Sequence, residues 1–286
     1  MPELPEVNAL VEYLDSELQG AVVAGVELAS FAVLKTFDPP IDSLAGLTVS
    51  GVRRHGKFID FDVDGIHLVI HLAKAGWLRW STGFSDKRIK MGNGPLALRV
   101  RIDRGDGPHE GFDLTEAGTR KGLAVYIVRD PADVPGIAAL GPEPLEAGFT
   151  IRPLLGRHMQ IKRLIRDQKI VAGIGNAYSD EILHVAKLSP FALADTLDDD
   201  EVDRLEQAIQ DVLREAVDEA RGKPAAELKD DKRTRMRVHG RTGETCPVCG
   251  DTVREVVYSG SSLQYCATCQ TGGKPLKDRA TSKFLK

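Results

Sequence analysis

The stretch Lys57-Phe-Ile-Asp-Phe-Asp-Val-Asp-Gly-Ile-His-Leu-Val-Ile-His-Leu72 decides how the first half of the chain folds. Apolar and polar residues alternate from Lys57 to Asp64, and apolar residues return at every second place from Ile66 to Leu72. This period of two is typical of strands with one buried face, and Asp64-Gly65 is a preferred two-residue turn between antiparallel strands. The stretch therefore predicts a β-hairpin.

The residues on either side extend this pattern. Further short strands are expected near 97–103 and 123–128, with turns rich in Gly and Pro between them. Before the hairpin, five apolar residues recur at helical spacing ahead of Gly20: Val7, Leu10, Val11, Leu14 and Leu18. Short strands in succession favour an antiparallel sandwich or barrel over a parallel sheet. Residues 1–132 are thus predicted to form an antiparallel β-sandwich with flanking helices.

The pattern changes after residue 132. Residues 133–150 are rich in Pro, Gly and Ala and are expected to form a linker. Helical spacing then dominates residues 151–237, where Asp198 and Glu201 have the arrangement of a capping box before a long helix. Within this region, the glycines before Asn176 lead into a helical pattern, which makes Asn176 a candidate helix start. A helix N-terminus binds phosphate well, although tight packing of a helical turn explains the same residues.

All four cysteines, Cys246, Cys249, Cys266 and Cys269, fall within 24 residues. Two Cys-x2-Cys motifs separated by 16 residues have the spacing of a tetrahedral zinc site. Two disulfides are the competing interpretation, which a reducing cytoplasm disfavours, and neither motif has the strand-to-helix context of a redox pair. Four sulfur ligands leave no open position, so one structural Zn²⁺ is expected in a finger at 238–271, with a hairpin between its motifs.

The overall composition is that of an ordinary globular protein. The chain has 286 residues, 42% hydrophobic and 28% charged, enough for two or three folded units. It has no run of about 18 apolar residues and no basic, apolar leader, so a cytoplasmic protein without a membrane partner is expected. The formal charge of −4 is uneven, because residues 229–286 hold 12 Lys and Arg against 6 Asp and Glu. This asymmetry hints at a polyanion-binding end, although a solvated basic tail, here 272–286, is the commoner cause.

The opening residues, Met1-Pro-Glu-Leu-Pro-Glu-Val7, have two interpretations. Proline and glutamate suit the first turn of a helix. Alternatively, removal of Met1 would leave Pro2 as an N-terminal secondary amine with a pKa of about 8. Such an amine is partly unprotonated at neutral pH and is a nucleophile toward carbonyl carbon. Taken alone, these seven residues favour the helix start.

In their order and spacing, these motifs resemble the formamidopyrimidine-DNA glycosylase and endonuclease VIII family of base-excision repair enzymes. The resemblance spans nearly the whole chain and adds the following motifs to the opening and the finger: Gly56-Lys57-Phe58, His71-Leu72, Gly76-x-Leu78-Arg79, Leu140-Gly-Pro-Glu-Pro-Leu145, Gly173-Ile-Gly-Asn-Ala-Tyr178 and Val238-His-Gly-Arg241. It implies an α+β multidomain fold, in which the sandwich precedes a helix-two-turn-helix module and the four-cysteine zinc finger. It also favours the nucleophile interpretation of Pro2.

The resemblance implies a bifunctional DNA glycosylase and abasic-site lyase. Such an enzyme excises damaged, here oxidised, bases from double-stranded DNA and nicks the strand by β/δ-elimination, acting as a monomer. Pro2 would form an iminium with the sugar, Glu3 would be the general acid and base, and Glu6 would support that end. Lys57 would contact a phosphate beside the lesion. Further DNA contacts are expected from Asn176, Lys162, Lys74, Arg120 and Lys121.

Three departures separate the chain from the family pattern. Ser261 stands where the family's finger hairpin has an arginine that grips phosphate, a contact that serine cannot replace. Lys74 and the pair Lys121-Gly122 stand where the family has side chains that fill the gap left by a flipped base. Substitutes available in this chain are Trp77, Arg120 and Lys121. The basic tail 272–286 is an extension beyond the finger, and it is either a solvated tail or a source of phosphate contacts.

These departures keep a second hypothesis open. The chain would then be a damaged-DNA or abasic-site binding protein with weak or no glycosylase activity. A third class, a zinc-dependent transcription regulator, fits the finger and leaves the opening residues unexplained.

Overall fold

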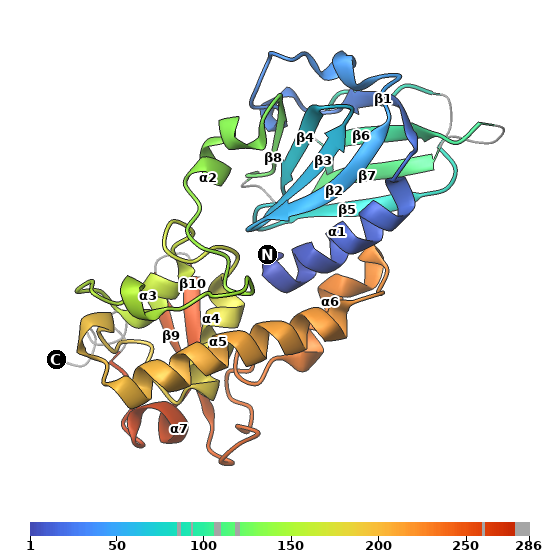
Figure 1. Cartoon of the computed structure of the whole chain (residues 1–286). Helices are drawn as coiled ribbons and strands as arrows, with labels where there is room; N and C mark the ends of the chain where they lie inside the picture. The colour runs from blue at the N-terminus through green and yellow to red at the C-terminus, as the bar shows by residue number, and fades with distance from the viewer. Residues whose placement is uncertain (85–86, 93, 106–109, 118–120, 259–260, 278–286) are drawn as a thin grey trace. The chain divides into compact units, whose positions relative to one another are not determined.

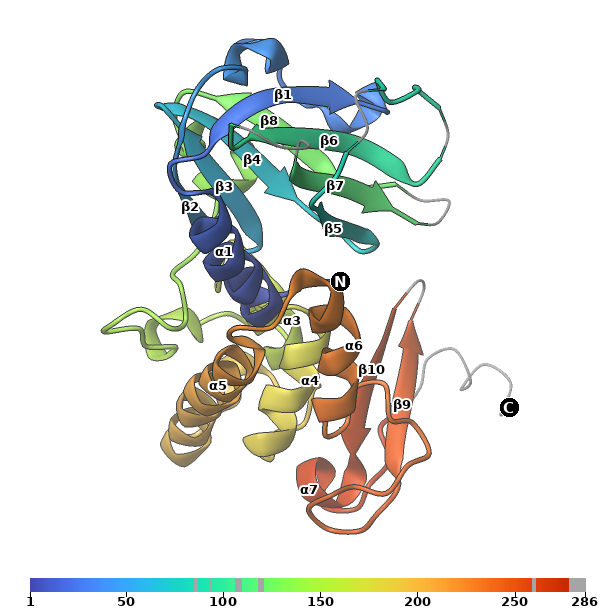
Figure 2. The ribbon, with the colours of Figure 1, turned by 90° about the vertical axis from the view of Figure 1, so that its right-hand side faces the viewer.

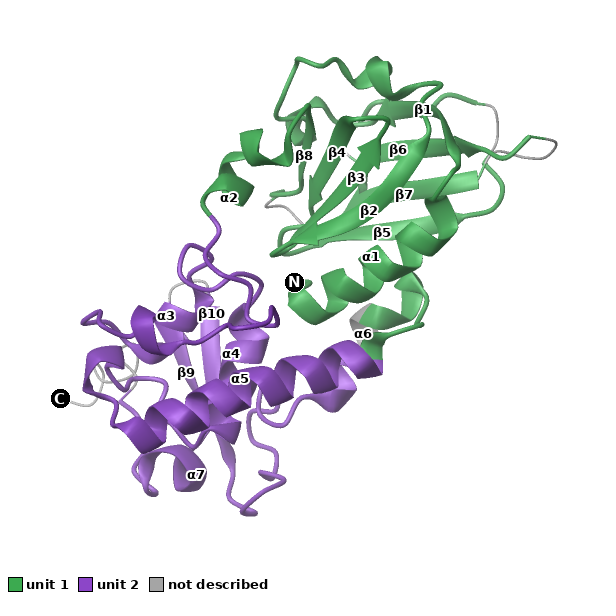
Figure 3. Ribbon diagram, viewed as in Figure 1, with its two compact units in different colours: residues 1–139, 220–229 green, residues 140–219, 230–286 purple. Residues whose placement is uncertain are grey.

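The structure is a computed structural model of the whole chain (Figure 1). It describes residues 1–84, 87–92, 94–105, 110–117, 121–258 and 261–277. The chain divides into two compact units, which are Met1–Ala139 with Ala220–Lys229 and Leu140–Glu219 with Asp230–Lys286 (Figure 3). In the described part of the chain, every helix is too short or too polar to cross a bilayer. The divisions expected at residues 132, 150 and 237 stay predictions.

Unit 1 is a sandwich of two four-stranded antiparallel sheets. One sheet has the strand order β2-β3-β4-β8, with bounds Val49–His55, Phe58–Val63, Ile66–His71 and Ala124–Val128. The other has the order β1-β6-β7-β5, with bounds Val22–Leu28, Leu96–Asp103, Glu110–Glu116 and Gly76–Ser81. Apolar residues of both sheets share one core, in which Phe61 and Phe112 stack with ring centroids 5.4 Å apart. The predicted antiparallel sandwich is confirmed.

The predicted hairpin is the pair β3 and β4. Phe58 pairs with His71 at one end and Val63 with Ile66 at the other. The turn residues Asp64 and Gly65 have φ values of +48° and +82°, which is the backbone of the turn that best matches strand twist. The strands expected near 97–103 and 123–128 correspond to β6 and β8.

Helices complete unit 1. α1 (Leu4–Leu18) lies against β2 and buries all five apolar residues that the helical spacing predicted. The chain returns to this core much later, through residues 220–229, which include the first part of α6 (Ala225–Arg235). Ala220, Ala225 and Leu228 are buried with the core of the sandwich. Short helical turns lie at Phe31–Val33, Ile41–Leu44, Pro131–Asp133 and Pro135–Ala138 (α2).

Unit 2 combines helices with the finger. α3 (Ile161–Arg166), α4 (Asn176–Val185) and the long α5 (Asp199–Ala220) follow turns at Arg152–Leu154 and, before α5, at Ala194–Thr196. The predicted capping box of α5 is confirmed, because the backbone N–H of Glu201 donates to Asp198 Oδ1 at 2.8 Å and that of Asp198 to Glu201 Oε2 at 3.2 Å. The finger is a hairpin, β9 (Val253–Tyr258) and β10 (Ser261–Cys266), followed by α7 (Ala267–Thr271). α4 lies beside β10 and α7 (Figure 2).

Candidate active site and metal centre

A reciprocal pair of hydrogen bonds holds the N-terminal residues at the start of α1. Glu3 is the N-cap, whose carboxylate accepts the backbone N–H of Glu6 while its own N–H donates to Glu6 Oε2 at 2.8 Å. Pro2 is buried, and Glu3 and Glu6 are only 2% and 1% exposed, whereas Met1 is 47% exposed. This capping box fixes the backbone just after Pro2. The helix-start interpretation is therefore correct, and it leaves the proline at a defined position.

Lys57 lies in the turn between β2 and β3 and is buried. The pairing of β3 with β4 brings His71 to the same end of the sheet, where its ring lies 4.7 Å from that of Phe58. Burial, with a smaller contribution from the positive charge of Lys57, lowers the pKa of His71 from 6.5 to about 4. His71 is therefore neutral at pH 7, and its ring nitrogens are one donor and one acceptor.

Arg54 connects this turn to α1. Its guanidinium donates to the carbonyl of Gly56 at 3.0 Å and to Asn8 Oδ1 at 3.4 Å. One side chain thus links Gly56, the residue before Lys57, to the second turn of α1. Arg54 consequently connects the turn that carries Lys57 to the helix that begins after Pro2.

The residues expected to fill the gap in DNA lie in different settings. Lys74 is exposed, and Lys121 is exposed with its ammonium donating to the carbonyl of Gly94 at 2.9 Å. The indole N–H of Trp77 donates to the carbonyl of Ala225 at 3.0 Å, and its ring packs on the core of unit 1. Trp77 therefore has a structural role in unit 1, and its use as a substitute gap-filling side chain stays a prediction. Arg120 lies outside the described residues.

α4 begins at Asn176, as the sequence predicted. Gly173 has a φ of +81° and Gly175 is the N-cap, so the glycines turn the chain into the helix. The Asn176 side-chain amide donates to the carbonyl of Ser262 in β10 at 2.8 Å, and its Oδ1 is buried without a partner among the described residues. Asn176 therefore holds the finger hairpin beside a helix N-terminus, a position that suits phosphate.

Lys162 is 4% exposed, and its ammonium contacts three acceptors. These are Asp180 Oδ1 at 2.6 Å, Ser179 Oγ at 2.6 Å and the carbonyl of Asn176 at 3.1 Å. Acceptors of this kind satisfy the hydrogens of a buried ammonium group. The geometry thus places Lys162 in the interior of unit 2, and its predicted contact with DNA stays a prediction. These contacts form where α3 packs on α4, and the spacing of residues in the sequence does not predict that packing.

Asp180 and its neighbour Glu181 bind the Val238-His-Gly-Arg241 motif to α4. Asp180 Oδ2 lies 2.7 Å from His239 Nδ1. The Glu181 carboxylate accepts the backbone N–H groups of Arg237, Val238 and His239 at 2.7 to 2.9 Å. Burial raises the pKa of Glu181, and these three N–H groups oppose that rise. The motif is therefore structural, since it joins the helical module to the start of the finger.

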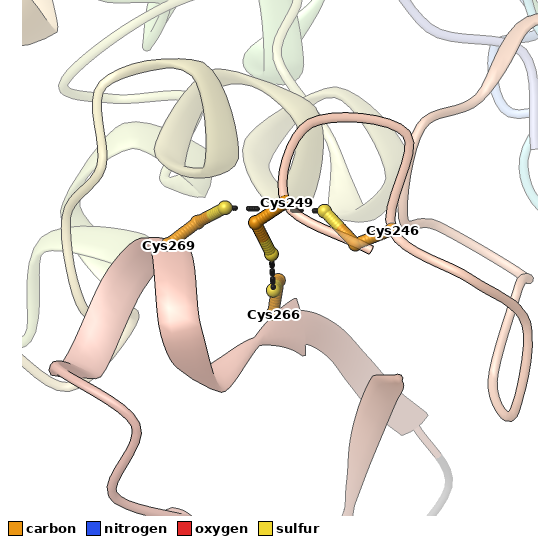
Figure 4. A group of neighbouring side chains, drawn as sticks. All are labelled: Cys246, Cys249, Cys266 and Cys269. Carbon is orange, nitrogen blue, oxygen red and sulfur yellow. Dashed lines mark hydrogen bonds between the residues drawn. The ribbon is translucent and has the colours of Figure 1, made fainter. Parts of the chain in front are cut away.

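The four cysteines form a single cluster. Figure 4 shows their thiols directed toward one another, and all four Sγ atoms lie within 4.8 Å. Two Sγ pairs, Cys246 with Cys269 and Cys249 with Cys266, are 3.9 and 3.3 Å apart. A tetrahedral ion with Zn–S bonds of about 2.3 Å places sulfurs roughly 3.8 Å apart, so the residues fit Zn²⁺. The predicted structural zinc site is confirmed.

Three family models match the chain. The formamidopyrimidine-DNA glycosylase N-terminal domain matches residues 1–121, the H2TH domain of the same enzymes matches residues 140–226, and the zinc finger found in FPG and IleRS matches residues 243–272. A formamidopyrimidine-DNA glycosylase from Pelotomaculum thermopropionicum is 33% identical, over 94% of this chain and 99% of that protein. The chain belongs to the formamidopyrimidine-DNA glycosylase family. The recognition made from the sequence motifs is confirmed.

Two further similarities frame its place in the formamidopyrimidine-DNA glycosylase family. An uncharacterized formamidopyrimidine-DNA glycosylase-like protein of Mycobacterium tuberculosis is 53% identical over 161 residues, which cover 54% of this chain and 99% of that protein. A variant of the Lactococcus lactis enzyme, solved in complex with DNA containing Fapy-dG, has a TM-score of 0.81 and 25% identity, with 94% of this chain and 100% of that chain covered.

The fingertip is where this member of the family departs from the pattern that its sequence resembles. Ser261 is exposed at the start of β10 and pairs with Tyr258 across the hairpin. The backbone beyond α7 folds back on the finger, because Leu276 N–H donates to the Tyr265 hydroxyl at 2.7 Å and its side chain packs against the apolar cluster that contains Tyr265. Leu276 thus anchors the described part of the tail on the finger, whereas residues 272–275 and 277 are exposed. Residues 278–286 lie outside the described part of the chain.

Three residues of these sites carried no clear signal in the sequence. His71 was visible only as part of a motif, without a role. Glu116 is 2% exposed, and its Oε1 accepts the backbone N–H groups of Gly122 and Leu123 at 2.7 and 3.1 Å. His184 lies on α4 with Nε2 3.3 Å from Cys246 Sγ, a contact between residues 62 positions apart. Burial, with a smaller contribution from the charge of Arg237, lowers the pKa of His184 to about 4.

Proposed function

We propose that the chain is a bifunctional DNA glycosylase and abasic-site lyase that acts on double-stranded DNA carrying an oxidised base or an abasic site. One observation carries the proposal: Pro2 stands directly before the buried Glu3–Glu6 capping box in a chain of this family. The Lactococcus lactis relative bound to Fapy-dG DNA supports DNA as the partner.

The proposed chemistry starts at the Pro2 nitrogen. After removal of Met1, this nitrogen attacks C1′ of the damaged nucleotide. The base leaves with the electrons of the glycosidic bond and takes up the proton that the Pro2 nitrogen loses. Glu3 protonates the sugar ring oxygen, so that the ring opens and an iminium forms between Pro2 and C1′. Because proline is a secondary amine, this iminium is cationic without gaining a proton. It draws electrons from the C2′–H bond, so that the C2′ proton passes to water and the 3′ phosphate leaves. Loss of the C4′ proton to water then expels the 5′ phosphate.

Glu6 and Lys57 have supporting roles in this proposal. Glu6 holds the Glu3 backbone, which keeps the amine and the Glu3 carboxylate in register. Lys57 and the start of α4 at Asn176 would contact phosphates, which position the strand without reading its sequence. Lys74 and Lys121 are exposed and would add charge contacts with the backbone. The buried Lys162 contributes to the frame that holds α4 instead.

Borohydride trapping tests the proposal. Zinc-loaded protein with an abasic duplex should form a covalent adduct, and a mass spectrum of the trapped peptide should place the sugar on Pro2. A Pro2→Gly variant should lose most of the adduct. Pro5→Ala is the matched control, because it removes a nearby proline from the first turn of α1 and keeps Pro2 as the N-terminal residue. Full trapping by protein that retains Met1 would exclude Pro2 as the nucleophile.

A second function is favoured by Ser261 alone. Without an arginine at the fingertip, the chain would bind damaged or abasic DNA and have weak or no glycosylase activity. A panel of duplexes, each with one defined lesion, separates the two functions when binding and strand cleavage are measured on the same samples. Tight binding without cleavage or trapping of any lesion would favour the binding protein.

Action as a monomer in the cytoplasm is part of the proposal. A four-thiolate zinc site suits a reducing compartment, where cysteines do not form disulfides. Light scattering of the zinc-loaded protein should give a single species near 31.1 kDa, and a stable dimer would contradict this part.

A further inference from the structure

The side chain of His184 in α4 reaches the cysteine cluster through a hydrogen bond. Its Nε2 lies 3.3 Å from Cys246 Sγ, within hydrogen-bonding distance for sulfur. Both residues are buried, with His184 2% and Cys246 1% exposed. The other ring nitrogen, Nδ1, is buried without a hydrogen-bond partner among the described residues. The contact with Cys246 is thus the hydrogen bond of this ring.

The chemistry of a filled zinc site sets the direction of this bond. A cysteine that binds Zn²⁺ is a thiolate and has no proton to donate, so the proton must lie on His184 Nε2. Among the described residues, the group of ligand atoms that lie within 4.8 Å of one another consists of the four cysteine Sγ atoms and does not include a nitrogen of His184. The histidine therefore contacts a ligand and does not join the four ligands of the metal.

We propose that His184 donates an N–H···S hydrogen bond to the zinc-bound thiolate of Cys246 and is a positioning residue of the zinc site. Four thiolates around one Zn²⁺ carry an excess of negative charge, which is unfavourable at a buried sulfur. A hydrogen-bond donor directed at that sulfur lowers this excess and fixes the orientation of the ligand. The donor belongs to the helix module, so zinc affinity depends on α4 as well as on the finger.

Other contacts hold α4 and the finger together around this bond. The Asn176 amide donates to Ser262 at the beginning of the helix. Just past its end, Gln270 of α7 donates to the carbonyl of Leu188 at 2.9 Å. His184 lies between Asn176 and Leu188 along the chain, and its hydrogen bond reaches a cysteine of the metal site. Zinc binding and the packing of α4 on the finger should consequently stabilise each other.

Zinc release from the full chain tests the inference. His184→Phe keeps a ring and removes the donor, and it should release zinc to excess chelator about tenfold faster or more, as expected when an outer hydrogen bond to a ligand is lost. His184→Gln keeps an amide N–H near the Nε2 position and should stay within about threefold of the wild type. His158→Phe is the matched control, because this histidine is largely exposed and bonds Asp195 instead of a cysteine.

Two spectroscopic measurements distinguish a hydrogen bond from general packing. In Co²⁺-loaded protein, His184→Phe should shift the thiolate-to-metal charge-transfer band to longer wavelength, since an unbonded thiolate gives up its electrons more easily. In the wild type, nitrogen shifts should show the imidazole proton on Nε2. A proton on Nδ1, or a His184→Phe protein with the native zinc-release rate and charge-transfer band, would overturn the inference. The wild-type measurement remains decisive if His184→Phe does not fold.

Discussion

Replacing Asp180 with asparagine should destabilise unit 2 more than any surface change, because it removes a charged partner of the buried Lys162 ammonium. Asp180 is fully buried, and its two carboxylate oxygens contact Lys162 Nζ at 2.6 Å and His239 Nδ1 at 2.7 Å. Removing one partner of a buried ion pair typically costs about 3–5 kcal/mol. At about 2–4 °C per kcal/mol, the melting temperature should fall by roughly 6–20 °C.

A double-mutant cycle separates this effect from general disruption. Lys162→Met should also destabilise unit 2, since it leaves the Asp180 carboxylate buried without its cation. The double variant, Asp180→Asn with Lys162→Met, should lose less free energy of unfolding than the two single variants lose together, by about 1 kcal/mol or more. Denaturant unfolding of the zinc-loaded chain provides these free energies. Lys74→Met is the matched control, and it should change stability by no more than about 0.5 kcal/mol because Lys74 is exposed.

The same variants decide whether Lys162 touches DNA. A lysine bound to a phosphate contributes about one unit to the slope of log affinity against log salt concentration. We expect Lys162→Met to leave this slope unchanged for an abasic duplex. A slope reduced by about one unit, or an Asp180→Asn protein as stable as the wild type, would refute the structural role of Lys162.

Four shorter predictions follow from the other sites. Glu6→Ala removes half of the capping box and should cost about 0.5–2 kcal/mol in thermal unfolding, while borohydride trapping falls further because Pro2 is no longer held; Glu12→Ala is the exposed control and should change neither. His71 has a pKa of about 4 when folded, so the unfolded chain takes up its proton first and stability should fall as the pH drops from about 6.5 to 4; a His71→Phe protein with the same acid slope would contradict this. Ser261→Arg should tighten binding of an abasic duplex and steepen its salt dependence by about one unit, and an unchanged salt dependence would show that the fingertip does not face a phosphate. Cys266→Ser should lose the single zinc and melt at lower temperature, and mild acid should release zinc from the wild type because protons compete for the thiolates; a metal-free wild type would exclude the site.

The fold was predictable wherever its determinants are close in sequence. The β3–β4 hairpin needs only alternation and the Asp64-Gly65 turn, and both are local. The Asp198–Glu201 capping box and the paired Cys-x2-Cys motifs depend on spacings of three residues. Short spacings of this kind fix geometry with little help from the rest of the molecule, because few backbone angles separate the partners.

The sequence by itself thus determined an antiparallel sandwich, a helical module, a zinc site and the family motifs that link them. Only the tertiary structure decided which polar residues are free to act. Trp77 bonds a carbonyl 148 positions away, and Lys162 lies within a network that reaches His239. His184, 62 positions from Cys246, touches the metal cluster from another part of unit 2. Periodicity reports which face of an element is buried, whereas the partner of a buried polar group depends on how elements distant in sequence pack together.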